Sequence, residues 1–248
     1  IFGPGIATGI VSGGPQLGAS TPTTQVPETY KSDSLLNYEF GLRSDWFDRT
    51  LRIDASAYFI DWTDPQVNQR SADNLAVYID NVGGVQGKGV DLSLRYLPPF
   101  IRGLSLTSGV SWNDTETTAA FDDVSGTTVP SGSPWPNAPH WQTSTTLAYA
   151  LPLSHWGVNA FVRHTYLGPA CNAINCTDKV FDYNTYDVNV SAFSLDHPLW
   201  PELSLSVENL TDERAINASS TTSVAGSDVN VINYIAPRAV IVRLSGRF

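Results

Sequence analysis

The most constraining feature of the chain is the alternation of apolar and polar side chains in its last strand-length segment. In residues 237–248, Val240, Val242 and Leu244 share one parity, and the residues between them are mostly polar. Successive side chains of a β-strand point to opposite faces, so this segment is predicted to be a strand with one apolar face. The segment ends on an aromatic residue, Phe248.

About eight upstream segments repeat this alternation, and short and long connections alternate between them. The predicted strands are residues 36–43, 51–59, 76–96 (bent at Gly83-Gly84), 104–112, 141–151, 156–166, 186–192 and 203–208. The predicted long connections are residues 63–75, 113–139, 168–182 and 212–236. The polar parity carries Ser, Thr, Asn and Gly with few charges, whereas the solvent face of a soluble sheet usually carries many Lys and Glu.

These patterns predict an all-β fold, an antiparallel up-and-down transmembrane β-barrel. A barrel strand needs only about 9–11 residues to cross a bilayer, and the chain has no apolar run long enough for a transmembrane helix. Counting back from a periplasmic C-terminus places every long connection outside the cell. A net charge of −10 argues against nucleic acid as a partner, because binding phosphates needs clustered Lys and Arg.

The chain divides into a segment at 1–33, predicted to be an external loop or irregular, and the barrel strands of 34–248. Cys171 and Cys176 are predicted to form a disulfide within a loop, since the expected compartment is oxidising. A zinc site is the weaker alternative, because two thiols lack the remaining ligands. We find no nucleophile-elbow motif and no phosphate loop, and we predict no enzyme, cofactor or metal.

Five groups of residues, in the right order, resemble the C-terminal half of the barrel of TonB-dependent outer-membrane receptors. They are VPET at 26–29 with LNYEFGLR at 36–43, AYFIDW at 57–62, NVG at 81–83 with GKGVDL at 87–92, ENLTD at 208–212, and Pro237-Arg238 with the terminal Phe248. The resemblance implies a barrel of about 22 strands with a plug in its lumen.

The chain would then supply about nine C-terminal strands, an odd number that does not close a typical bacterial barrel. The resemblance implies, as partners, outer-membrane lipid, the remaining strands, the plug domain and TonB, with the plug and the TonB contact absent from this chain. It also implies import of a scarce nutrient, most commonly a ferric siderophore or similar chelate.

Ligand contacts are expected in the long loops and the upper lumen. The candidates by position are Asp122, Asp123, Trp135, Trp141 and Tyr183. Two other functions stay open: a passive porin-like channel, which needs no TonB, and a secreted β-rich enzyme or carbohydrate-binding protein, which would be soluble without detergent.

Overall fold

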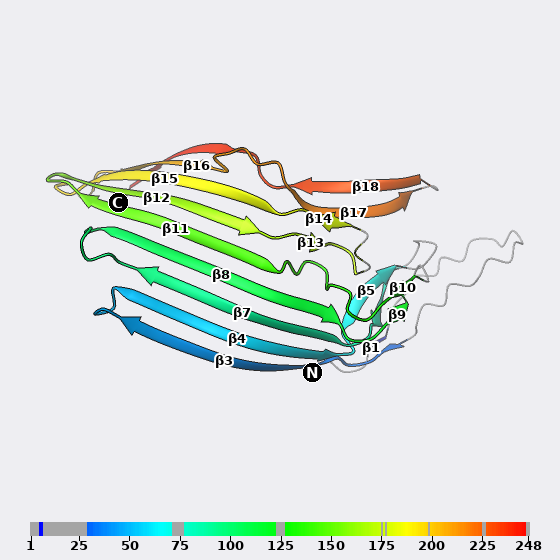
Figure 1. Cartoon of the computed structure of the whole chain (residues 1–248). Helices are drawn as coiled ribbons and strands as arrows, with labels where there is room; N and C mark the ends of the chain where they lie inside the picture. The colour runs from blue at the N-terminus through cyan, green and yellow to red at the C-terminus, as the bar shows by residue number, and fades with distance from the viewer. Residues whose placement is uncertain are drawn as a thin grey trace, which may run out of the picture.

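The computed structural model is a curved wall of antiparallel β-strands (Figure 1). It describes residues 5–6, 29–70, 77–122, 127–174, 176, 178–197, 199–224 and 227–246. Nine long strands form the wall, and each pairs with the next one along the chain. They are β3 (Ser34–Trp46), β4 (Leu51–Thr63), β7 (Val85–Tyr96), β8 (Leu104–Thr117), β11 (Trp141–Pro152), β12 (Trp156–Leu167), β15 (Tyr183–Ser194), β16 (Glu202–Glu208) and β19 (Ala239–Ser245). The predicted all-β, antiparallel up-and-down architecture is confirmed.

Short turns join the strands at one end of the wall, the turn end, and long connections leave from the other, the loop end (Figure 1). Each long connection contains a two-stranded hairpin of its own. These are β5 (Gln66–Arg70) with β6 (Val77–Asn81), β9 (Phe121–Asp122) with β10 (Thr128–Val129), β13 (Ala170–Cys171) with β14 (Lys179–Val180), and β17 (Ile216–Val224) with β18 (Ser227–Tyr234). The short strands β1 (Gly5–Ile6) and β2 (Thr29–Tyr30) pair with each other.

The prediction of one bent strand over 76–96 is wrong in its first part. Residues of β6 pair with β5 instead of the wall, and the Val82 N–H donates to the carbonyl of Pro65 at 3.0 Å, which closes this hairpin. Pairing with the wall starts at Val85, opposite Trp62 of β4. Two-residue periodicity cannot distinguish one continuous wall strand from a hairpin strand followed by a wall strand, because β6 and β7 are both extended.

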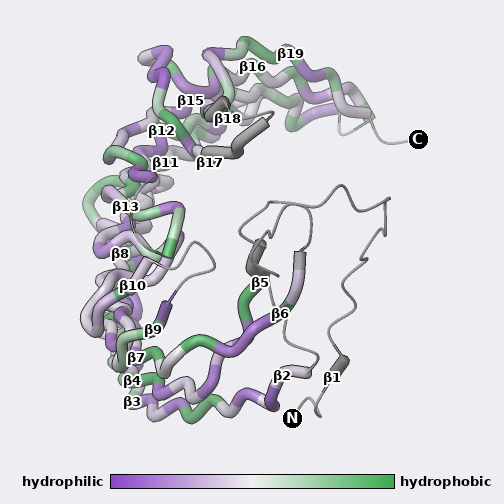
Figure 2. The backbone as a smooth tube through the Cα atoms, turned by 90° about the vertical axis from the view of Figure 1, so that its right-hand side faces the viewer, coloured by the Kyte–Doolittle hydropathy of each residue, from purple (hydrophilic) through white to green (hydrophobic). Residues whose placement is uncertain are grey.

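Most apolar residues of the nine strands lie on the convex face of the wall. The strand registers align one unbroken row across the sheet, and every member is apolar or aromatic. The row is Trp46, Leu51, Tyr96, Leu106, Leu147, Val162, Val188, Val207 and Val240. Seen along the strands, the sheet is an arc with β5 and β6 on its hollow side (Figure 2).

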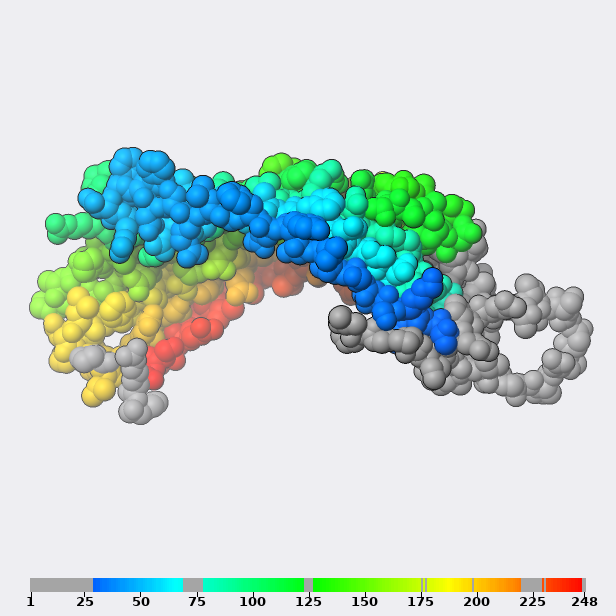
Figure 3. Space-filling model, turned by 90° about the horizontal axis from the view of Figure 1, so that it is seen from below, coloured from blue at the N-terminus to red at the C-terminus, as the bar shows by residue number. Residues whose placement is uncertain are grey.

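These apolar side chains are not packed against a second sheet. Val240 is 66% exposed, Leu205 47% and Leu147 48%. A soluble β-sandwich would bury this parity between two layers, so the geometry of the wall is that of a barrel surrounded by hydrocarbon. The edge strands β3 and β19, blue and red in Figure 3, pair on one side only within the described sheet.

The apolar face has aromatic and charged borders. Trp112 and Trp141 lie directly opposite each other on β8 and β11 towards the loop end. One step further along the same face, Lys88 and Asp114 form an ion pair with an N–O distance of 3.1 Å. Aromatic girdles followed by charge are typical of the interfaces that border the hydrocarbon layer. No helix among the described residues has the length and apolar character needed to cross a bilayer.

Candidate ligand site at the loop end of the concave face

The concave face of the wall carries a broad polar depression of about 700 Å³. It is lined mainly by small or hydrophilic side chains of the polar parity, among them Gly41, Arg43, Asp54, Ser56, Asp91, Ser93, Gly109, Ser111, Gln142, Ser144 and Thr165. The Arg43 guanidinium pairs with Asp54 at 2.6 Å, and the Ser111 hydroxyl donates to Asp91 at 2.6 Å. The side chains of the polar parity are therefore mostly hydrophilic and partly paired with one another, as those on the wall of a filled or watery lumen should be.

An aromatic pair lies at the loop-end margin of this face. The rings of Trp62 and Trp135 are 5.8 Å apart between centroids and tilted by 59°. The Trp62 indole N–H donates to a carboxylate oxygen of Asp33 at 2.9 Å. The backbone N–H of Trp135 donates to the carbonyl of Thr115 at 2.8 Å, which holds its loop against β8. Both rings are half-buried, so each keeps surface that a ligand can contact.

Trp135 was a candidate from position in the sequence, whereas its partner Trp62 was missed. The signal for Trp62 was present in the sequence: it shares the parity of Arg52, Asp54 and Tyr58, which faces the lumen, and not that of Phe59. An aromatic residue on the polar parity of a barrel strand is unusual and marks a position worth testing.

The other candidates lie in different places. Tyr183 begins β15 on the concave face, opposite Leu167, which lines the polar depression. Trp141 lies on the convex face and is 49% exposed. Asp122 belongs to β9, where one of its carboxylate oxygens accepts a hydrogen bond from the Thr128 hydroxyl at 2.6 Å. Asp123 lies outside the described residues.

The structure thus brings Trp135 together with Trp62 and puts Tyr183 on the same face, but it separates Trp141 from them. Among the described residues, no three His, Cys, Asp or Glu side chains converge in a way that could hold a metal ion. The groups that this part of the wall presents are aromatic faces, hydroxyls and backbone groups, which are the kinds of group that contact small molecules in binding pockets.

The Cys171–Cys176 disulfide lies where three long connections meet. The two Cα atoms are 4.9 Å apart, and the Cys171 carbonyl accepts a hydrogen bond from the N–H of Asn137 at 2.7 Å. The side-chain amide of Asn172 donates to the carbonyl of Ser219 on β17 at 3.2 Å. The disulfide loop therefore links its two neighbouring loops across the loop end.

Reduction of this disulfide is expected to loosen the hairpin β17–β18 while leaving the wall intact. A ring this small constrains the unfolded loop by about 2 kcal/mol. In the purified receptor, hydrogen exchange of 216–224 should speed up after reduction, whereas that of β11 and β12 should not. Neither cysteine should react with iodoacetamide before reduction. Ready labelling of the unreduced protein would contradict the disulfide.

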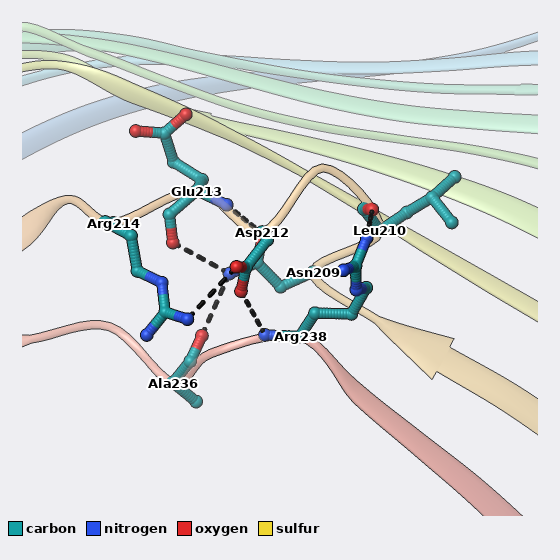
Figure 4. Close-up of polar contacts among 7 residues, drawn as sticks. All are labelled: Asn209, Leu210, Asp212, Glu213, Arg214, Ala236 and Arg238. Atoms are coloured by element: carbon teal, nitrogen blue, oxygen red, sulfur yellow. Dashed lines mark hydrogen bonds and ion pairs between the residues drawn. The ribbon is translucent and has the colours of Figure 1, made fainter.

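A second polar cluster closes the connection that carries β17 and β18 (Figure 4). Asn209 is 5% exposed, and its side-chain N–H groups donate to the carbonyls of Glu213 and Ala236, both at 2.9 Å. Its side-chain oxygen accepts from the Glu213 N–H at 2.8 Å. Asp212 accepts from the Arg238 N–H at 2.9 Å and from the Arg214 guanidinium at 3.0 Å. These residues hold the two ends of the connection together.

This cluster should weaken in acid. The Arg238 N–H, followed by the Arg214 guanidinium, lowers the pKa of Asp212 below its ordinary value of 3.8. A carboxyl whose pKa falls on folding stabilises the fold above its unfolded pKa and loses that effect as the pH falls through the folded pKa. Proteolysis of 212–236 should therefore increase as the pH falls below about 4. An Asp212→Asn variant should lack this dependence, and an unchanged profile in the variant would contradict the role of Asp212.

The wall defines the chain as part of a transmembrane β-barrel. The family model for the TonB-dependent receptor-like β-barrel matches residues 1–210, and the chain belongs to this family. Its members are receptors and transporters of the bacterial outer membrane. The search of curated proteins returned no match.

Solved structures with the same fold are TonB-dependent receptors that differ widely in sequence. The ferric yersiniabactin uptake receptor FyuA from Yersinia pestis has a TM-score of 0.68 at 17% identity, over 99% of this chain and 34% of that one. The siderophore receptor PiuA from Acinetobacter baumannii has a TM-score of 0.62 at 19% identity, over 86% of this chain and 28% of that one. The copper transporter OprC has a TM-score of 0.62 at 15% identity, over 88% of this chain and 32% of that one. The chain therefore spans about a third of the length of these receptors.

Proposed function

We propose that the chain is the C-terminal part of the barrel of a receptor that binds a small nutrient at the loop end and imports it with energy supplied by TonB. The loop end would face the cell exterior and the turn end the periplasm. The observation that carries the proposal is the Trp62–Trp135 pair at the loop-end margin of a polar lumen wall. Family membership supports the same proposal.

We further propose a ferric siderophore or similar metal chelate as the cargo. Aromatic faces stack on planar rings and attract cationic groups, and the hydroxyl-rich wall offers hydrogen bonds to the periphery of a chelate. By their descriptions, FyuA is an uptake receptor for ferric yersiniabactin, PiuA is a siderophore receptor and OprC is a copper transporter. The choice of a chelate over a bare metal rests on the absence of converging His, Cys, Asp and Glu side chains among the described residues.

The proposal is tested on the complete receptor with a panel of ferric siderophores, by the quenching of tryptophan fluorescence. We expect one member to bind, and Trp62→Ala or Trp135→Ala to weaken it about three- to tenfold, the loss expected for one aromatic contact. Trp141→Ala, on the convex face, is the matched control and should bind normally. An equal loss in all three variants would contradict the site.

Uptake into cells separates the proposal from the passive porin alternative. Import of the bound chelate should stop when TonB is deleted. A passive channel would keep importing without TonB and would show steady conductance in a planar bilayer. Import that survives the deletion would overturn the proposed mechanism.

A further inference from the structure

Two arginines face each other on the concave face near the turn end. Arg52 of β4 and Arg95 of β7 are directly opposite in the register. Arg52 is neutralised by Asp45, with N–O distances of 2.7 and 3.0 Å. Arg95 is exposed, and its side chain has no ion pair or hydrogen bond within the described part of the chain. Like charges directly opposite each other on a sheet are destabilising, and Asp45 compensates only Arg52, so Arg95 is the member of the pair that still needs an anion.

Among the described residues of the neighbouring strands, no unpaired acid lies near Arg95 at the turn end to supply that anion. Asp45 is held by Arg52, and Asp54 is paired with Arg43 at 2.6 Å. On the other side of Arg95, the register places Thr107 of β8, which is uncharged. Within the described wall, the charge of Arg95 is therefore left uncompensated.

A third arginine lies beside Arg95. Arg102 lies in the turn between β7 and β8. Arg95 and Arg102 both line a second depression, of about 440 Å³. Arg102 too lacks an ion pair or hydrogen bond among the described residues. The turn is fixed, because Gly103 has a φ of +86° and its carbonyl accepts from the N–H of Ala150 on β11 at 2.9 Å. Any Cβ at position 103 would overlap the Ala150 carbonyl oxygen. Arg102 therefore starts from a well-defined backbone position.

We propose that Arg95 and Arg102 together bind a carboxylate of the polypeptide that fills the lumen in the complete receptor. This inference rests on the proposed function, since it takes the chain as the wall of a plugged barrel. A guanidinium presents a planar fork of N–H donors that matches a carboxylate. Because this chain spans about a third of receptors with its fold, most of such a receptor lies outside it. The occupant is thus an Asp or Glu of that remaining sequence.

A lipid phosphate fits the observations less well. Arg95 shares the parity of Ser93 and Asp91, which line the polar depression of the lumen wall. The convex parity of the same strand carries Leu94 and Tyr96. Lipid would contact the convex face, so a headgroup could reach the turn residue Arg102 more readily than Arg95. A site that needs both arginines is therefore a site in the lumen.

The test uses Arg95→Lys in the complete receptor, because the introduced amine can form an amide with a neighbouring carboxylate. Treatment with a water-soluble carbodiimide, followed by mass spectrometry, should give a cross-link to an Asp or Glu outside residues 34–248. The matched control is Arg49→Lys, in the adjacent turn, which should give no link outside the wall. Heat-modified mobility on gels confirms that each variant is folded. A link to Asp45 alone, or no link, would overturn the proposal.

A second readout concerns the seal of the lumen. In planar bilayers, an Arg95→Ala/Arg102→Ala receptor should open at least about tenfold more often than the unmodified receptor in moderate urea, the factor that corresponds to about 1.4 kcal/mol. An effect that vanishes in bilayers without anionic phospholipid would indicate a lipid phosphate site instead and overturn the proposal. A cross-link in a receptor that imports no chelate would support this inference and contradict only the proposed function.

Discussion

Replacing Asn209 by Ala should detach the connection that carries β17 and β18 from the end of the wall. The substitution removes three side-chain hydrogen bonds, to two carbonyls and one N–H, at a side chain that is only 5% exposed. It also leaves an alanine at a φ of +48°, where asparagine is better tolerated. We expect a loss of about 3 kcal/mol in local stability, because each unsatisfied buried group costs about 1–3 kcal/mol. Hydrogen exchange and proteolysis of 212–236 measure it.

The matched control is Asn189→Ala. Asn189 also donates two hydrogen bonds, to the hydroxyls of Ser204 and Ser206, at 2.8 and 2.7 Å. Those hydroxyls lie on the concave face of the wall and can turn to water, so the loss should be smaller and should leave 212–236 protected. If Asn209→Ala also leaves that connection protected, the cluster around Asn209 does not hold it.

The wall could be predicted from the sequence because one physical rule determines it. A strand between hydrocarbon and a polar lumen must alternate at period two, so the faces of Val240, Leu205 and Leu147 follow from parity alone. The hairpins in the long connections carry no such constraint. Residues 77–81 are equally suited to extending the wall or to pairing with β5. The ladder with β5 and the hydrogen bond from Val82 to Pro65 show which of the two forms.

The candidate site could be predicted only in part, because position along a strand does not give position in space. Trp135 and Trp141 both lie near the start of the same strand, yet one contacts Trp62 and the other lies opposite Trp112 on the convex face. Trp141 has the same parity as Leu147, which already places it on the convex face and away from the lumen. The partner of Trp135 depends on how its loop folds back along β8, and no local pattern encodes that.

The same distinction explains the arginines of the turn end. Their parity identifies Arg52 and Arg95 as lumen residues, but the register is needed to show that they lie directly opposite each other. Arg95 lacks a partner because the nearby acids, Asp45 and Asp54, are paired with Arg52 and Arg43. This lack of a partner is therefore a property of the folded wall and cannot be counted from the net charge of the chain.

Val242→Arg should impair assembly of the barrel, whereas Ser245→Arg should be tolerated. Val242 lies on the convex face of β19, 69% exposed and opposite Leu205, where hydrocarbon would surround it. An Arg near the bilayer midplane costs about 2–4 kcal/mol. Ser245 has the opposite parity and lies across from Glu202, so an Arg there gains a neighbour of opposite charge. Urea unfolding in lipid vesicles gives both free energies, with heat-modified mobility as the check on folding. Equal destabilisation by the two substitutions would mean that hydrocarbon does not contact the convex face, and the receptor assignment of this wall would lose its physical basis.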